Sequence, residues 1–148
     1  MIAWSVTSAA VCDSCGDEAA SQELGQVLRG GRVCWDAEFR CPACEAAACL
    51  GFGTGETPLW VREPLLARHG TVRLRLTGPP PERVAVLRAV REASAGTLPQ
   101  ALEAARQLAG EGLPGTLPEA AWLRERLAAR GVAAEVLSSR GPTGGRRG

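Results

Sequence analysis

The clearest periodic patterns in the chain are two stretches of alternating side chains, each running into a pair of cysteines. Before the first pair, Trp4, Val6 and Ser8 occupy every second position. Before the second pair, the alternating positions are Val33, Trp35, Ala37 and Phe39. A period of two places successive side chains on opposite faces of an extended backbone. Each stretch is therefore predicted to be a β-strand that leads into a cysteine turn.

The second half of the chain predicts strands and helices in turn. Val72, Leu74 and Leu76 alternate with arginines within residues 71–77, which is typical of a half-buried strand. Helices are expected over residues 82–95, from the N-cap Thr97, and from Pro118 to Gly131. A short strand within 111–117 and a final strand over 132–137 complete the order. This order indicates an α/β sandwich.

Between these two parts, a glycine-rich joint and one helix are predicted. Gly51, Gly53 and Gly55 predict a flexible joint. Thr57 is a suitable N-cap for the helix, and Gly70 is expected to end it.

The connecting helix has a predicted apolar stripe and a proline that favours a break. The stripe consists of Leu59, Trp60, Leu65 and Leu66. Pro64 favours a split of the helix because it cannot donate a backbone hydrogen bond. His69, the one histidine of the sequence, is expected to interact with the C-terminal end of this helix and not to act as a catalytic base.

Charge is divided unequally along the chain. Residues 1–56 carry three Arg and eight Asp or Glu, a net charge of −5. Residues 57–148 carry fourteen Arg and eight Glu, a net charge of +6. The overall charge of +1 gives no drive toward nucleic acid or an anionic membrane. With the cysteine positions, this division predicts a cysteine-containing N-terminal module over 1–56, a connecting helix over 57–70, an α/β domain over 71–138 and a disordered Gly/Arg tail over 139–148.

The hydropathy of the 148 residues bears on the cellular location of the protein. No stretch approaches the roughly 20 apolar residues of a membrane-spanning helix. The first residues lack the basic region of a signal peptide. We therefore expect a cytoplasmic protein without a membrane partner.

All six cysteines lie between positions 12 and 49. Cys12 and Cys15 form one CxxC pair, and Cys41 and Cys44 form another. In the cytoplasm such clustering indicates metal binding, the alternatives being two disulfides or a redox CxxC motif. Two CxxC turns supply four thiolates to a tetrahedral ion and leave no open position, so one structural Zn²⁺ is expected. The N-terminal module resembles a zinc ribbon in this pattern.

Two cysteines are left over by this assignment, Cys34 and Cys49. They are expected to be small core residues, because free cysteine is commonly buried. The alternative is that one of them replaces a ligand of the CxxC turns.

Two segments of the second half carry a resemblance to a known family. RVAVLRAVREA at 83–93 and LRERLAARGVAAEV at 123–136 resemble the C-terminal domain of the bacterial ribosomal stalk protein L-seven/L-twelve. The resemblance spans about residues 72–137 and implies a three-stranded sheet packed against three helices. The family's lysine-containing turn is replaced by AGTLPQAL, where Pro99 and Leu102 occupy the two lysine positions. The family's dimerisation helices are also absent, with the ribbon in their place.

The helix predicted within 82–95 has two different faces. At 100° per residue, Val86, Ala89, Val90 and Ala93 fall on one side, which is expected to pack on the sheet. The opposite side carries Val84, Leu87, Arg88 and Arg91, an apolar pair beside two guanidinium groups. This set is the predicted partner site, the alternative being that the connecting helix or the ribbon covers it. In the stalk family the matching positions contact translational GTPases.

The sequence offers no catalytic constellation, so no enzymatic activity is expected. Overall the chain is assigned to the α+β class, as a ribbon followed by a small α/β sandwich. The expected function is a zinc-binding protein-interaction module whose partner is a translation factor or ribosomal component. Alternatives are a nucleic-acid-binding regulatory ribbon protein, or an adaptor for another machine. The acidic ribbon counts against nucleic acid. Neither the oligomeric state nor the partner's identity follows from the sequence.

Overall fold

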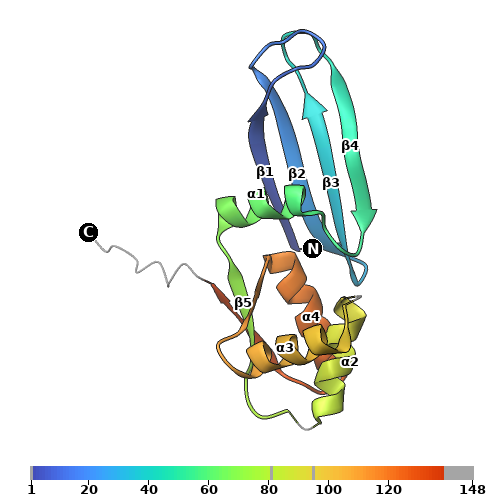
Figure 1. Cartoon of the computed structure of the whole chain (residues 1–148), viewed down its shortest axis with the longest axis vertical. Helices are drawn as coiled ribbons and strands as arrows, with labels where there is room; N and C mark the ends of the chain where they lie inside the picture. The colour runs from blue at the N-terminus through green and yellow to red at the C-terminus, as the bar shows by residue number, and fades with distance from the viewer. Residues whose placement is uncertain (1, 81, 95, 139–148) are drawn as a thin grey trace, which may run out of the picture.

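The computed structural model describes residues 2–80, 82–94 and 96–138. It is a mixed α+β structure with two antiparallel sheets and four helices among these residues (Figure 1). The first sheet has the order β1-β2-β3-β4 and the second has the order β6-β5-β7. The element bounds are β1 Ile2–Ala10, β2 Ala20–Arg29, β3 Arg32–Arg40, β4 Ala47–Thr54, α1 Leu59–His69, β5 Val72–Leu76, α2 Arg83–Ala93, α3 Leu98–Ala109, β6 Leu113–Gly115, α4 Leu117–Ala129 and β7 Ala134–Ser138.

The first sheet is a meander whose long strands extend away from the second half of the chain (Figure 1). The predicted strands before the two cysteine pairs are confirmed as β1 and β3. β2 and β4 were not predicted. β2 turns into β3 through Gly30 and Gly31, whose φ values of 58° and 71° are those that a two-residue hairpin turn requires.

Gly51 and Gly53 lie inside β4, so the prediction of a flexible joint at these positions is wrong. The indole of Trp35 lies against both glycines. A Cβ atom on Gly51 would lie 2.9 Å from Cη2 of that ring, and one on Gly53 would lie 2.9 Å from Nε1. These glycines therefore let an aromatic ring rest on the strand backbone. Gly55, with a φ of 92°, lies just beyond the strand.

α1 covers one face of the first sheet near the second half of the chain (Figure 1). Val61 and Leu65 are fully buried there against Leu24 and Ala37. The predicted stripe is therefore wrong for its first two members, since Leu59 and Trp60 are exposed.

The C-terminal end of α1 follows the prediction, but its start and its interior do not. The N-cap is Pro58, with no side-chain cap hydrogen bond, so the predicted N-cap Thr57 is wrong. Pro64 lies inside one continuous helix, so the predicted split is wrong. The N–H of Gly70 donates to the carbonyl of Leu66 and ends the helix. His69 is the last helical residue; it stacks on Trp4 and its Nε2 lies 2.8 Å from the carbonyl oxygen of Ser5.

In the second half, the alternating strand 71–77 is confirmed as β5, the central strand of its sheet. Val72, Leu74 and Leu76 are buried, and the arginines between them are exposed. Three helices and two further strands follow in the predicted order. α3 and α4 begin with capping boxes, in which the hydroxyls of Thr97 and Thr116 accept the N–H three residues later. Gly131 follows α4 in the left-handed conformation, with a φ of 74°.

The two halves are packed together through α4 and the end of the β2–β3 hairpin. Leu28 and Val33 of the hairpin and Ala121 of α4 form one buried cluster. Trp122 lies beside this cluster and donates from Nε1 to the carbonyl of Gly31 at 2.7 Å. The first sheet is thereby fixed to the second half of the chain.

A buried polar network lies next to this contact. The Gln26 Nε2 donates to the Thr57 hydroxyl at 2.8 Å and to Glu119 Oε2 at 3.3 Å, and the Thr116 hydroxyl donates to the Gln26 Oε1. Arg62 of α1 pairs with Glu119 at 3.0 Å. The network therefore joins β2, the segment before α1, α1 itself and the start of α4.

No helix among the described residues is long and apolar enough to cross a membrane. The predicted disordered tail, 139–148, lies outside the described residues.

Candidate metal centre

The two CxxC turns meet at the end of the first sheet that lies far from α1 (Figure 1). The first turn connects β1 to β2, and the second connects β3 to β4. β1 pairs with β2 and β2 pairs with β3, so the strands that lead into the turns are separated by one strand. Ala10 is opposite Ala20, and Ser21 is opposite Arg40. This register brings both turns to the same end of the sheet.

All four predicted thiols come together there. The Sγ atoms of Cys12, Cys15, Cys41 and Cys44 lie within 4.8 Å of one another. The Sγ–Sγ distance is 3.7 Å between Cys12 and Cys44, and also 3.7 Å between Cys15 and Cys41. A tetrahedron with zinc–sulfur bonds of about 2.3 Å has sulfur–sulfur edges of about 3.8 Å. The donor set and its spacing therefore fit a single tetrahedral metal ion.

The same distances exclude disulfides between these cysteines in this structure. A disulfide requires sulfur atoms about 2.05 Å apart. All six cysteines have free thiols. Four thiolate ligands would fill the coordination sphere, so an ion bound here would have no position open to a substrate.

Backbone geometry holds each turn in shape. The Cys12 N–H donates to the Asp17 carbonyl at 3.0 Å, and the Cys41 N–H donates to the Ala46 carbonyl at 2.8 Å. Gly16 takes the left-handed conformation after the first pair, with a φ of 74°. Glu45 takes the equivalent place after the second pair with a φ of 60°, although this conformation is uncommon for a residue with a side chain. Both turns therefore share one backbone shape.

Hydrogen bonds within the cluster separate the pKa values of its thiols. Backbone N–H donation from Cys15, and then from Ser14, lowers the pKa of Cys12 to about 7 against the effect of burial. The Asp17 N–H also lowers the pKa of Cys15, but desolvation and the other three thiols together raise that pKa to about 12. The pKa of Cys44 is also raised: donation from the Ala46 N–H is outweighed by desolvation and neighbouring thiols. Several thiolates in so small a space require a cation to offset their charge.

Cys34 and Cys49 lie away from the four-thiol cluster. Cys34 is half-buried on β3 and is paired in register with Thr54. Cys49 is exposed on β4 opposite Glu38. The expectation that both are core residues is therefore wrong for Cys49. Neither belongs to the cluster of four, so a substituted ligand is not seen.

The predicted partner residues lie on α2, at the far end of the molecule from the thiols (Figure 1). Val86, Ala89 and Val90 are buried against the second sheet, as the helix periodicity predicts. On the opposite face of α2, Val84 is 53% exposed, and Arg88 and Arg91 are also exposed. Leu87 is half-buried and packs against the same core. α1 lies against the first sheet and leaves Val84 uncovered.

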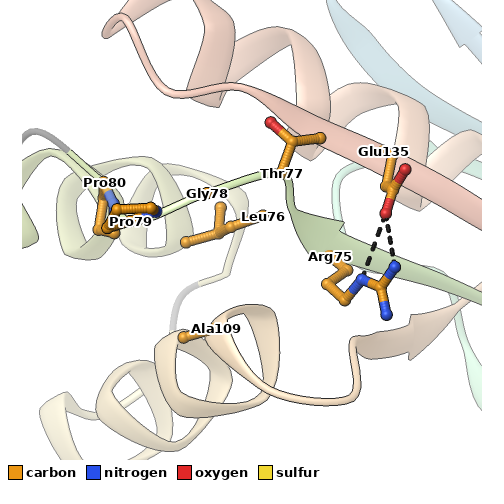
Figure 2. A pocket seen from close by; sticks show the side chains of 8 residues that line it. All are labelled: Arg75, Leu76, Thr77, Gly78, Pro79, Pro80, Ala109 and Glu135. Atoms are coloured by element: carbon orange, nitrogen blue, oxygen red, sulfur yellow. Dashed lines mark hydrogen bonds and ion pairs between the residues drawn. The ribbon is translucent and has the colours of Figure 1, made fainter.

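A hollow lies beside β5. Figure 2 shows its lining, where the residues that follow β5 face Ala109 at the end of α3. Its charged side chains, Arg75 and Glu135, pair with each other at 2.7 Å.

Comparison of the chain with protein-family models, with curated proteins and with solved structures found no match. The residues of the chain itself therefore carry the functional argument.

Sequence reasoning missed the contacts between the halves. Gln26 stands among alternating residues of β2, and its burial depends on Thr57 and Thr116, which are distant in sequence. No local signal identifies such a residue. Trp122 carried a partial signal of a contact outside its own helix, because it lies off the face of α4 that buries Leu123 and Leu127. Its partner is the carbonyl of Gly31.

Proposed function

We propose that this protein is a non-enzymatic, zinc-binding protein-interaction module of the cytoplasm. The observation that carries the proposal is the cluster of four thiols, spaced as a closed tetrahedral site. Zinc in such a site stabilises the fold and does not contact a substrate. The first sheet has a separate small core around the thiols, where Cys12 and Cys41 are buried with Ala20. A bound ion would hold this end of the sheet together.

The second half is proposed to be a domain like the C-terminal domain of the ribosomal stalk protein. Support comes from the order of its elements, strand, helix, helix, strand, helix, strand, in a sheet of order β6-β5-β7. The family's fold, a three-stranded sheet against three helices, has the same composition. The segments that resemble the family most, 83–93 and 123–136, form α2 and the region from α4 into β7.

The proposed partner is a translational GTPase or a ribosomal component, and the proposed contact surface is α2. Its support is the exposure of Val84, Arg88 and Arg91 beside the half-buried Leu87. An exposed apolar side chain with guanidinium groups around it is common at protein interfaces. A nucleic-acid role is less well supported, because the residues next to the cysteines in the sequence are acidic: Asp13, Asp17, Glu18 and Glu45.

Metal analysis tests the zinc assignment. The purified protein should contain one zinc per chain, and Cys15→Ser should lower that content and destabilise the first sheet. Less than half an equivalent of zinc, with the thiols oxidised in pairs, would contradict the proposal.

The α2 surface is tested with the variant Val84→Asp/Arg88→Glu and a purified translational GTPase. Both residues are exposed, so the free energy of unfolding should change by no more than about 0.5 kcal/mol. Binding should weaken at least about tenfold, the size of effect expected from removal of interface anchors. Leu87 is left unchanged because it packs against the core.

The matched control makes the same chemical changes on the first half, as Leu59→Asp/Arg29→Glu. Both of these residues are exposed. This variant should bind the GTPase as the wild type does. Equal binding by all three proteins would exclude α2 as the contact surface, and no binding by the wild type would exclude the partner class.

A further inference from the structure

β4 forms an edge of the first sheet, and no strand among the described residues pairs with its outer side (Figure 1). Residues 46–55, AAACLGFGTG, contain neither a charged residue nor a proline. Edge strands are normally protected by charges, prolines or covering elements, because their unpaired N–H and C=O groups bind other strands. An uncharged edge of eight residues is therefore suited to accept a further strand.

The face of the β4 edge toward α1 is aromatic. Gly51 and Gly53 have no side chains, and the Trp35 indole lies directly on them. Trp60 of α1 packs edge-on to Trp35, with ring centroids 5.9 Å apart, and is 46% exposed. A strand added beside β4 would place every second side chain next to these two rings. Apolar side chains suit those positions because they would remove exposed aromatic surface from water.

The opposite face of the same edge is acidic in its middle, with Arg40, opposite Ala47, beyond the acidic residues toward the cysteine turns. Phe52, which is 79% exposed, is opposite Asp36 on β3, and Cys49 is opposite Glu38. Glu38 is itself opposite Glu23 on β2. All three carboxylates are exposed, and among the described residues none has an ion-pair partner. Two like charges directly opposite each other destabilise a sheet, so a cationic partner would relieve them.

We propose that the β4 edge binds an extended segment of a partner protein in which apolar and basic residues alternate. The segment's backbone pairs with β4, its apolar side chains contact Trp35 and Trp60, and its basic side chains reach toward Glu38. Strands lie about 4.8 Å apart, so an added strand lies about 10 Å from β3, within reach of Arg and Lys side chains.

Charge argues against a second copy of the chain as the occupant. Pairing of two β4 edges would bring two ribbons together, each with a net charge of −5 over residues 1–56. This surface lies on the first sheet and is separate from α2, so the inference does not depend on the proposed contact of α2 with a translational partner.

The test uses the zinc-loaded full chain and synthetic peptides. The probe alternates Val and Arg over seven residues, and the controls are the Val/Glu equivalent and a peptide of the same composition with its arginines in one block. NMR should show shifts of the amides of residues 47–54 and of the indole N–H signals of Trp35 and Trp60. Both controls should bind at least about tenfold more weakly. N-methylation of alternate peptide bonds should abolish binding, because strand pairing requires backbone donors.

Two variants test the chemistry of the surface. Phe52→Lys adds a charge typical of protected edges and faces Asp36, so it should weaken the Val/Arg peptide at least about tenfold without loss of zinc. Glu38→Lys should weaken the Val/Arg peptide and strengthen the Val/Glu peptide. Val84→Lys, which converts another exposed apolar residue to lysine on α2, should leave both affinities unchanged.

Three results would overturn the inference. The first is equal binding of the alternating and blocked basic peptides, which would show non-specific charge attraction. The second is no binding of any peptide at millimolar concentration. The third is a wild-type dimer in sedimentation that Phe52→Lys converts to a monomer, which would assign the β4 edge to a second copy of the chain.

Discussion

Replacement of Gln26 by leucine should destabilise the protein more than most single changes, because it empties the centre of the buried polar network. Gln26 is 1% exposed, and its side chain is the hydrogen-bond partner of the hydroxyls of Thr57 and Thr116, which are also buried. Leucine has a similar volume but can neither donate nor accept. Both hydroxyls would then lose a partner while remaining out of contact with water.

The magnitude follows from these two losses. A buried polar group left without a partner costs about 1–3 kcal/mol. The Thr116 hydroxyl still accepts from the Glu119 N–H at 3.3 Å, so its loss lies at the low end. Leucine regains part of the total through its apolar burial. We therefore expect the free energy of unfolding to fall by about 2–4 kcal/mol.

Urea denaturation of the zinc-loaded protein measures this quantity. Gln22→Leu is the matched control, since Gln22 lies on the same strand and is half-buried without such a network, and it should change stability by no more than about 0.5 kcal/mol. Adding Thr57→Val to Gln26→Leu should cost less than the sum of the two single changes, because one unpaired hydroxyl is removed. If Gln26→Leu shifted the free energy of unfolding by less than about 0.5 kcal/mol, the network would have no role in stability.

Three further changes have expected outcomes. Zinc affinity, measured by competition with a chelator between about pH 6 and 8, should rise with pH, because Cys15 and Cys44 have raised pKa values and must each release a proton; an affinity independent of pH would contradict this. Trp122→Phe should cost about 1 kcal/mol in thermal or urea unfolding, because the hydrogen bond to the Gly31 carbonyl is lost, whereas unchanged stability would mean that this bond contributes nothing. Pro64→Ala should stabilise the protein by about 1–2 kcal/mol, because alanine restores a helical N–H donor; a loss of stability would show that the proline ring packs better than expected.

The candidate metal centre could be predicted almost completely from the sequence. Two CxxC turns identify the four thiols by spacing, and an alternating strand before each turn predicts where the turns begin. The assembly of the four thiols required one additional fact, that β2 lies between β1 and β3 with a register that aligns both turns. β2 escaped prediction because Gln26, a polar residue, occupies one of its inward positions.

The α2 surface was predictable in its orientation but not in its detail. Helical periodicity separated the buried Val86, Ala89 and Val90 from the exposed side. It could not show that Leu87 is half-buried, because that depends on how the neighbouring elements pack against α2. The exposure of Val84 was likewise decided by the position of α1 on the other half of the molecule.

By itself the sequence determined those features whose signals are local. These are the cysteine turns, the alternating strands, the capping boxes that begin α3 and α4, and Gly70 at the end of α1. Each depends on residues within a few positions, where side-chain spacing and backbone hydrogen bonds act directly. Local chemistry also predicted that Pro64 would break α1, and this prediction is wrong. Val61 and Leu65 are fully buried on the sheet, and their packing keeps α1 continuous although Pro64 has no N–H to donate.

Only the tertiary structure decided the features that need a distant partner. Gly51 and Gly53 belong to a strand and not to a joint. The Trp35 indole packs on the backbone there, in the space that side chains would occupy. Gln26 could be buried because Thr57 and Thr116 satisfy its amide. The two halves became one packed unit through Trp122 and the β2–β3 turn. In each case the free energy comes from contacts between residues far apart in the chain, which no local pattern records.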